Sequence, residues 1–229
     1  MIIVKDVTWN NIDNLSSQDI SYLLFIEGKD SKTISIIRNI PKIEVEKHII
    51  HCKIKYKIYK YGHDSKSMLK ALINCPKDER LMIINSLDKE KIYEIEDYII
   101  ENIFNANKKE CTFYIWFLGE IKSTKGIDTI ITFLKCSDAQ IKRMCCSAIG
   151  KIGCIKAEDE LIKILSEKRL QVKEYAIKAL GRIKSKKSLN YLYSIEKNGE
   201  KEYIKLAASY AIENIKKGEK SCEWRLHYT

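Results

Sequence analysis

The chain has few of the residues that most often interrupt helices. Its 229 residues include only 2 prolines and 9 glycines, which is below average usage. Hydrophobic residues make up 45% of the chain, enough to build a sizeable core. A chain that can bury a core and has few helix breakers is most simply built from helices joined by short connections. We therefore expect an all-α protein.

Long apolar runs, a secretory leader and disulfide-like cysteine spacing are also missing. No apolar run approaches the roughly 18 residues of a membrane-spanning helix. The start, MIIVKDVTWNN, lacks a basic segment followed by a long apolar one. The 8 cysteines form no C-x-x-C pair, and the adjacent Cys145 and Cys146 lie in an apolar helical run, as small buried residues of a reducing compartment do. We expect a cytoplasmic protein that does not contact membranes.

Acidic residues are in the minority. Lysine and arginine total 41 against 31 aspartates and glutamates, which gives a net charge of +10. Such an excess of cations suits an acidic partner such as nucleic acid. The sequence is also rich in Ile, Lys and Asn, as low-GC genomes produce, and lysine greatly outnumbers the arginine that phosphate-binding surfaces often favour. Charge alone therefore leaves both a nucleic-acid partner and a compositional bias open.

A 31-residue repeat runs through the last two thirds of the chain. It is visible as three series of equivalent residues: Gly119, Gly150 and Gly181; Leu118, Ile149 and Leu180; and Ile99, Ile130 and Leu161. Each unit holds two amphipathic segments, and a single helix pair cannot bury its apolar faces alone. We expect stacked helix pairs, with alanines allowing close approach. The glycines fall near the end of each first helix, where we expect a left-handed or open turn.

The units resemble HEAT repeats, specifically the short repeats of bacterial HEAT-repeat and bilin-lyase-like proteins. The resemblance rests on AIGKI at 148–152, ALGRI at 179–183 and KAEDELIKIL at 156–165, whereas FLGEI at 117–121 departs from it by a bulky Phe. It covers roughly residues 77 to 217 and implies a right-handed α-solenoid. HEAT repeats mostly bind proteins, sometimes bind nucleic acid and rarely catalyse reactions, so the resemblance implies a binding scaffold.

The N-terminal third lacks the repeat and divides into three helical segments. We expect helices at about 18–27 and 31–38, and a longer third helix that begins near Pro41 and continues through KHIIHCKIKYKIYKYGH at 47–63. Asp30 can cap the second helix, and Asn39 tolerates the left-handed conformation of a tight turn. A stripe of Ile50, Ile54, Ile58 and Tyr61 is expected to pack the third helix on the solenoid.

This pattern resembles a helix-turn-helix, with Gly28, Ile34, Ser35, Ile40 and Val45 in the positions typical of that family. Arg38 departs from it because a buried Leu is usual there, and Asn39 replaces the turn glycine. The resemblance implies that the third helix enters the major groove of DNA with Lys42, Glu44, Lys47 and His48 at its exposed end. A plain three-helix cap is the alternative. The expected division is a leader at 1–16, the three-helix region at 17–66, about four and a half repeats at 67–217, and a tail at 218–229.

Candidate nucleic-acid contacts gather in two places. On the third helix they are Lys42, Lys47, His48, His51, Lys53, Lys57 and Lys60. In the turns inside successive repeats they are Lys122, Lys125, Lys151, Lys156, Arg182, Lys184, Lys186 and Lys187. Acids are nearly absent from these turns, so stacking would align the cations as a ridge that could follow a phosphate backbone. The structural alternative is that cations complement the negative C-terminal end of each first helix.

Catalytic motifs are not found. The sequence contains no Walker A loop, G-x-G-x-x-G, H-E-x-x-H or G-x-S-x-G. His48, His51, Cys52 and His63 lack a further ligand at metal-binding spacing. We expect no enzyme activity, cofactor, metal or small-molecule substrate. The leading hypothesis is a scaffold that binds DNA or another nucleic acid, and the alternative is a protein-binding adaptor. A helical-repeat alkylpurine DNA glycosylase is a third hypothesis, for which no Trp/Asp/Arg set can be aligned, and bilin lyase activity is suggested only by the repeat family.

Overall fold

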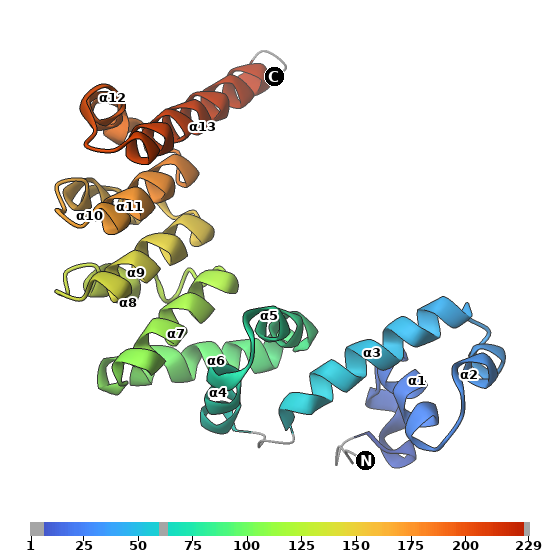
Figure 1. Ribbon diagram of the computed structural model, residues 1–229. Coiled ribbons are helices and arrows are strands. Elements are labelled where there is room, and N and C mark those ends of the chain that lie inside the picture. Colours follow the sequence, from blue (N-terminus) through green and yellow to red (C-terminus); the bar gives the residue numbers. More distant parts are fainter. Residues whose placement is uncertain (1–6, 60–63, 227–229) are drawn as a thin grey trace. The chain divides into compact units, whose positions relative to one another are not determined.

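The computed structural model describes residues 7–59 and 64–226, and every regular element in these ranges is a helix (Figure 1). Tertiary contacts divide the chain into two compact units, Met1–Tyr98 and Ile99–Thr229. The all-α fold class predicted from the scarcity of helix breakers is confirmed.

The first unit contains the three helices expected in the N-terminal third. After a short 3-10 helix, η1 (Trp9–Asn14), come α1 (Ser17–Ile26), α2 (Ser31–Arg38) and α3 (Lys42–Tyr59). Asp30 caps α2 by accepting a 2.7 Å hydrogen bond from the Thr33 amide, and Asn39 has the left-handed φ of 50° that the turn requires. The unit continues with α4 (Ser65–Asn74), α5 (Lys77–Ser86) and the start of α6 (Lys89–Asn102), and both α4 and α5 pack against α3.

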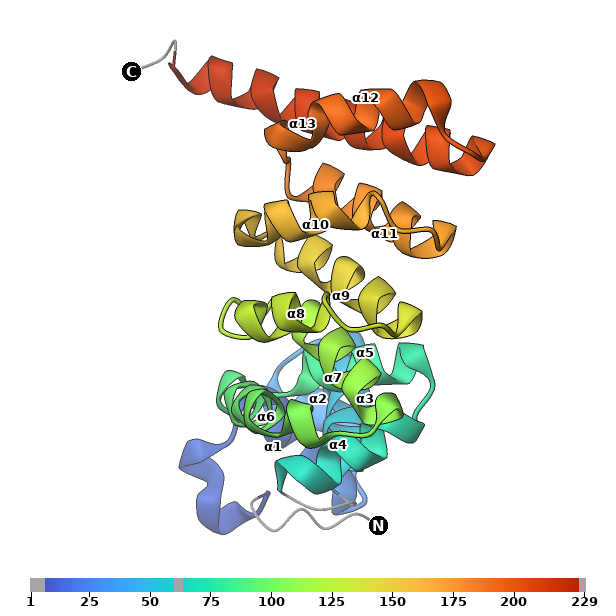
Figure 2. The same ribbon diagram turned by 90° about the vertical axis from the view of Figure 1, so that its left-hand side faces the viewer.

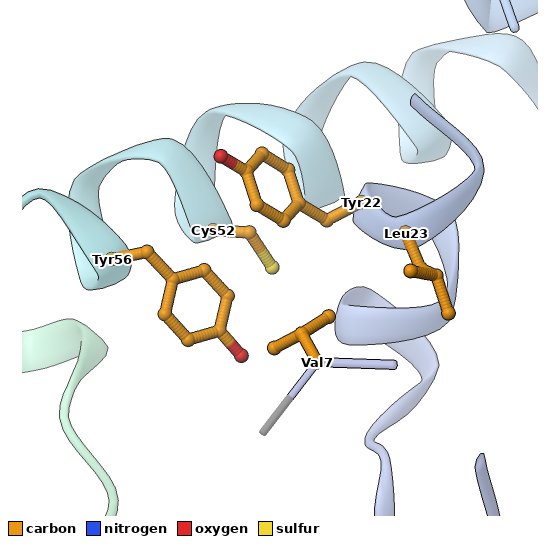
Figure 3. Close-up of a cluster of buried hydrophobic side chains, with 5 residues drawn as sticks. All are labelled: Val7, Tyr22, Leu23, Cys52 and Tyr56. Atoms are coloured by element: carbon orange, nitrogen blue, oxygen red, sulfur yellow. The ribbon is translucent and has the colours of Figure 1, made fainter. Parts of the chain in front are cut away.

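The core of the three-helix region lies between α1 and α3. Figure 3 shows Val7, Tyr22, Cys52 and Tyr56 directed toward one another, with the rings of Tyr22 and Tyr56 stacked 5.5 Å apart. Val7 and the partly buried Leu15 belong to the expected leader, so this part of the leader joins the core. A second cluster joins α2 to the same helices through Leu24, Ile34, Val45 and Ile49.

The prediction that Ile50, Ile54, Ile58 and Tyr61 form the packed stripe of α3 is wrong for Ile50. Ile50 is 56% exposed, whereas Val45, Ile49, Cys52 and Tyr56 are buried. Both stripes have helical spacing, so spacing alone does not separate them, and α1 and α2 decide which face is covered. The side chain of Ile58 and all of Tyr61 lie outside the described residues.

Arg38, the departure from the helix-turn-helix pattern, connects α2 to α1. Its guanidinium donates hydrogen bonds to the Ser17 carbonyl oxygen, to Ser21 Oγ at 2.6 Å and to Ser17 Oγ at 3.0 Å. A partly buried guanidinium is tolerated here because several acceptors satisfy its donors. The position thus holds the two helices together by hydrogen bonds in place of the usual apolar contact.

The second unit is a solenoid of HEAT-like helix pairs. Its first helices are α7 (Lys108–Glu120), α9 (Ala139–Ile152), α11 (Leu170–Arg182) and α13 (Glu202–Leu226), and its second helices are α8 (Ile127–Phe133), α10 (Glu158–Ile164) and α12 (Leu189–Asn198). Figures 1 and 2 show the first helices side by side in one row. Each second helix packs on the first helix that follows it. Short 3-10 turns, η2 (Ile103–Asn105), η3 (Ile155–Ala157) and η4 (Lys186–Ser188), precede α7, α10 and α12.

The repeated glycines act at helix crossings and not at turns, which corrects the expectation from the sequence. A methyl group on Gly119 would lie 2.8 Å from the Cα of Ala148, and one on Gly181 would lie 2.8 Å from the Cα of Ala211. Glycine is therefore needed because consecutive first helices approach each other backbone to backbone. The left-handed turn falls three residues later in each unit, at Lys122 (φ 55°), Gly153 (φ 77°) and Lys184 (φ 56°).

The helix α13 lacks the small residue that would accept another helix in the same way. Gly150 and Gly181 each follow two residues after the alanine that packs on the preceding helix, and Glu213 stands at that position after Ala211. Glu213 is exposed and forms a 2.6 Å ion pair with Lys217. A further first helix could not approach α13 as closely as α13 approaches α11, because the side chain of Glu213 stands where the earlier first helices have glycine.

The substitution Gly181→Ala tests the backbone contact. Alanine normally favours a helix interior by up to about 1 kcal/mol over glycine. Here we expect a loss of about 1–3 kcal/mol in the free energy of unfolding, because the new methyl group overpacks against Ala211. Urea denaturation measures the change, and adding Ala211→Gly should recover part of it.

The matched control is Gly150→Ala. Its methyl group would lie 3.2 Å from the Cα of Ala179 and 3.1 Å from the flexible Arg182 side chain, so the loss should be smaller. If Gly181→Ala were as stable as the unaltered protein, the helix crossing would not be limited by space.

Candidate functional site

Three cations of the predicted ridge are held by acids of the preceding repeat. The pairs are Lys151–Glu120 at 2.6 Å, Lys156–Asp128 at 2.6 Å and Lys187–Asp159 at 2.5 Å. The acids belong to helices and not to the turns, so the search of the turns alone did not find them. These lysines connect neighbouring repeats, a structural role that differs from the expected pairing of cations with helix ends.

The same kind of pair recurs at the other end of the first helices. There the pairs are Lys108–Asp138 at 2.7 Å, Lys142–Glu167 at 2.9 Å and Lys173–Glu200 at 2.9 Å. In each pair the two residues lie 25 to 30 positions apart and belong to successive repeats. Six lysines of the solenoid therefore lie in ion pairs between successive repeats.

Other ridge cations lack such a partner in the described part of the chain. Lys122, Arg182 and Lys184 are exposed at the C-terminal ends of α7 and α11, and none of the three has an ion pair or a side-chain hydrogen bond among the described residues. Lys125 and Lys186 are also exposed, but each has an interaction of its own. Without competing carboxylates, the first three are available to bind an external anion.

Two of these cations line one depression in the surface of the solenoid. It has a volume of about 500 Å³ and is formed by the C-terminal ends of α9 and α11 and the neighbouring part of α13. The lining residues are Gly150, Lys151, Gly153, Gly181, Arg182, Lys184, Asn214 and Lys217. All four charged members are cations, and none of the described lining residues is acidic.

The candidates on α3 are less available. Lys42 and Lys47 are exposed but pair with Glu46 at 3.4 Å and with Glu44 at 3.7 Å on their own helix. His48 was expected at the exposed end of the helix, and this is wrong, because it is only 8% exposed. Its Nδ1 lies 3.0 Å from Ser21 Oγ and its Nε2 lies 3.3 Å from Glu44. The imidazole thus holds α3 against α1.

Of the remaining α3 candidates, His51 adds little charge and Lys53 contacts an aromatic ring. Burial, together with the neighbouring charge of Lys55, lowers the pKa of His51, so its ring is mainly neutral near pH 7. Lys53 places its Nζ 4.4 Å from the centroid of the Phe25 ring. The side chain of Lys57 and all of Lys60 lie outside the described residues. Ile43, which is 65% exposed, and Ile50 lie on the same open face as Lys47, so this face is partly apolar.

A buried polar network around Asp19 also fastens α3 to α1. The carboxylate accepts hydrogen bonds from the Ser16 amide at 3.2 Å, from Ser16 Oγ at 2.6 Å and from the Tyr56 hydroxyl, and Lys55 Nζ lies 3.5 Å away. Burial raises the pKa of Asp19, but the bonds from Ser16 and Tyr56 and the charge of Lys55 outweigh burial and lower this pKa. The network is structural, and no sequence pattern indicated it.

The network gives Asp19→Asn a pH-dependent effect. At pH 7 we expect the free energy of unfolding to fall by about 1–3 kcal/mol, because charge-assisted hydrogen bonds are removed. The folded-state pKa lies below the unfolded value of about 3.9, so the contribution of Asp19 is present above that pH and is lost as pH falls through the folded pKa.

The measurement is urea denaturation of both proteins at about pH 7 and pH 3. The difference between them should shrink at the lower pH, whereas the exposed Asp13→Asn control should change little at either. A difference that stays the same at both pH values would show that the charge of Asp19 does not stabilise the fold.

The buried cysteines are unreactive, and metal-binding groups do not assemble in the described part of the chain. Burial, followed by the nearby Asp19 carboxylate, raises the pKa of Cys52 to about 12, so its thiol stays protonated at neutral pH. Cys145 and Cys146 are fully buried, as their apolar context predicted. No three His, Cys, Asp or Glu side chains among the described residues converge as metal ligands. No helix within the described ranges is both long and apolar enough to cross a membrane.

Comparison with known proteins agrees with the helical-repeat architecture. Residues 127–213, from α8 into α13, match the family model for HEAT repeats. A crystal structure of an engineered protein from the Northeast Structural Genomics Consortium is 19% identical, with a TM-score of 0.52 over 89% of this chain and 98% of that chain. At this identity the likeness concerns the fold alone. No curated protein matches the chain. The HEAT-repeat interpretation is thus supported, whereas the narrower bilin-lyase-like type is not shown.

Proposed function

We propose that this protein is a non-enzymatic HEAT-like scaffold that binds nucleic acid through the cationic C-terminal ends of its first helices. The observation that carries the proposal is the depression lined by Lys151, Arg182, Lys184 and Lys217, with no acid among its described lining residues. An anion held there would contact cations from three successive first helices. Phosphate is the anion that a nucleic acid presents at every nucleotide, and arginine binds it through paired N–H groups.

The cations without partners also favour the depression, and not α3, as the nucleic-acid contact. Arg182 and Lys184 bind an anion without breaking an existing ion pair, and Lys122 extends the free positive charge to the end of α7. On α3, by contrast, His48 is buried and the lysines near the N-terminus have carboxylate partners. The helix-turn-helix-like region is therefore not assigned DNA contact in this proposal.

A glycosylase function is not supported by the aromatic residues. Trp116 is buried, and its ring stacks on Phe113 with the centroids 5.5 Å apart inside the core of the solenoid. An alkylpurine DNA glycosylase would need aromatic side chains in an open groove beside a carboxylate, and the depression described above has neither among its lining residues. A binding role suits the fold better than catalysis.

A protein-binding adaptor is the second candidate, favoured by exposed aromatic and aliphatic side chains on the last helices. These are Tyr191 on α12 and Tyr203, Leu206 and Tyr210 on α13. Tyrosine is enriched in protein–protein interfaces because it combines a large apolar ring with a hydrogen-bonding hydroxyl. The two candidates differ in whether the binding partner must be a polyanion.

Fluorescence anisotropy with labelled oligonucleotides of about 20 nucleotides, single-stranded and duplex, tests the proposal. We expect binding at about 50 mM salt that weakens steeply toward about 200 mM, because phosphate contacts release counterions. Failure to bind any single strand or duplex at the lower salt would exclude the nucleic-acid function and leave the adaptor.

The substitution Glu120→Gln should strengthen binding. It releases Lys151, which lines the depression, from its ion pair. We expect the affinity for the oligonucleotide to rise about 2- to 5-fold. The control Glu160→Gln removes the same charge from α10, where Glu160 pairs with Lys163. An equal rise in both variants would mean that only net charge matters and that the position of Lys151 does not.

A further inference from the structure

We propose that the depression at Arg182 and Lys184 holds one backbone phosphate of a single-stranded nucleic acid, while the ring of Tyr210 stacks on an adjacent base. The inference rests on the proposed function and specifies its binding site and its ligand. It assigns the phosphate to one site, and it makes single strands the preferred form over duplex. Three observations carry it: the unpaired cations, the backbone of Lys184 and the free ring of Tyr210.

The two unpaired cations of the depression, Arg182 and Lys184, both lie at the C-terminal end of α11. Arg182 is the last residue of α11 and Lys184 follows two residues later, so both heads are close to the depression that they line. Lys151 and Lys217 remain beside them as cations held by Glu120 and Glu213 at 2.6 Å each. The guanidinium of Arg182 can bind two phosphate oxygens, Lys184 can bind a third, and the amide of Asn214 adds a donor.

The backbone at Lys184 is unusual for a lysine. Its φ of 56° lies in the left-handed region, which is strained for residues with a Cβ and unstrained for glycine. The preceding repeat has Gly153 at the equivalent position, and that residue lines the same depression. Glycine at position 184 would therefore make the folded protein more stable, whereas lysine at this position places a cation at the depression.

The ring of Tyr210 is available for stacking. Tyr210 is 65% exposed and has no contact with another ring or with a cation among the described residues. It lies one turn before Asn214 on α13, so its side chain is the helical neighbour of a residue that lines the depression. Tyr175 and Tyr193 are engaged with Arg143 and Lys216. Tyr191 and Tyr203 are also exposed, but neither is a one-turn helical neighbour of Asn214.

A free ring beside a phosphate site distinguishes single strands from other polyanions. Bases of a single strand can turn out and stack on an aromatic side chain, while the bases of a duplex are already stacked on each other. An acidic peptide would use the cations but would gain nothing from a base-stacking ring. The ring therefore favours a single-stranded nucleic acid as the partner.

The phosphate site is tested with the double variant Arg182→Gln/Lys184→Gln and a labelled thymidine strand of about 20 nucleotides. We expect the affinity to fall about 10-fold or more, and the slope of log K against log salt to become shallower by about 0.7 for each phosphate that the protein no longer neutralises. The control Lys168→Gln/Lys197→Gln removes the same charge from exposed positions at the opposite end of the helix pairs and should change the affinity less than about 2-fold.

The variant Lys184→Gly separates binding from folding. Because glycine suits the left-handed backbone, this variant should unfold at the same temperature as the unaltered protein or higher. It should nevertheless bind the strand more weakly. If Lys184→Gly and the double variant both bound the strand as tightly as the unaltered protein, with the fold intact, the phosphate site would be overturned.

Stacking is tested with Tyr210→Ala and Tyr210→Phe. The alanine variant should bind the strand about 5-fold or more weakly, because one base loses its stacking partner, and the phenylalanine variant should bind nearly as well as the unaltered protein. Affinity for a duplex and for polyglutamate should not change in either variant. An equal loss for all three ligands, or tighter binding of polyglutamate than of the strand, would overturn stacking and indicate an acidic protein partner.

The outcomes separate the two proposals. If the unaltered chain binds neither strand nor duplex at low salt, the proposed nucleic-acid function fails. If the chain binds nucleic acid but neither the Arg182/Lys184 variant nor the Tyr210 variant differs from its control, this inference fails and the general function stands.

Discussion

The close approach of consecutive first helices is the constraint on which the solenoid depends. At each crossing a glycine of one helix faces an alanine of the next, and a methyl group at Gly119 or Gly181 would lie within 2.8 Å of the facing backbone. This spacing lets α7, α9, α11 and α13 form one row and brings the cations of successive repeats to the same edge. On α13, Glu213 stands in the position of the glycine. Packing of small residues therefore fixes both the core and the placement of the surface charge.

Charge in this protein has two different uses. At the C-terminal ends of the first helices acids of one repeat pair with lysines of the next, and at the N-terminal ends lysines pair with acids that follow in the chain, so these lysines connect successive repeats. Among the described residues of the ridge, the cations that remain without partners are concentrated at the ends of α7 and α11. A high net charge is thus a poor guide to a binding surface, because the position of the carboxylates decides which cations can meet a partner.

The first unit uses polar contacts to set its helices. Arg38 joins α2 to α1 through serine hydrogen bonds, and Asp19 and His48 join α1 to α3. The groups that a helix-turn-helix would present to DNA are in part the groups that hold this region together. Its open face carries Ile43 and Ile50, and these exposed apolar side chains differ from the polar surface that contacts bases and phosphates.

The helical class, the 31-residue repeat, and the helices and turns of the N-terminal third could be predicted from the sequence, because helix breakers, caps and apolar spacing act locally along the chain. The buried stripe of α3, the need for the repeat glycines and the set of cations without partners emerge only in the folded chain. Each of these depends on atoms about 30 residues away, as in the pairs Gly181 with Ala211 and Lys151 with Glu120. Local spacing cannot reveal such contacts, since they exist only after the repeats have stacked.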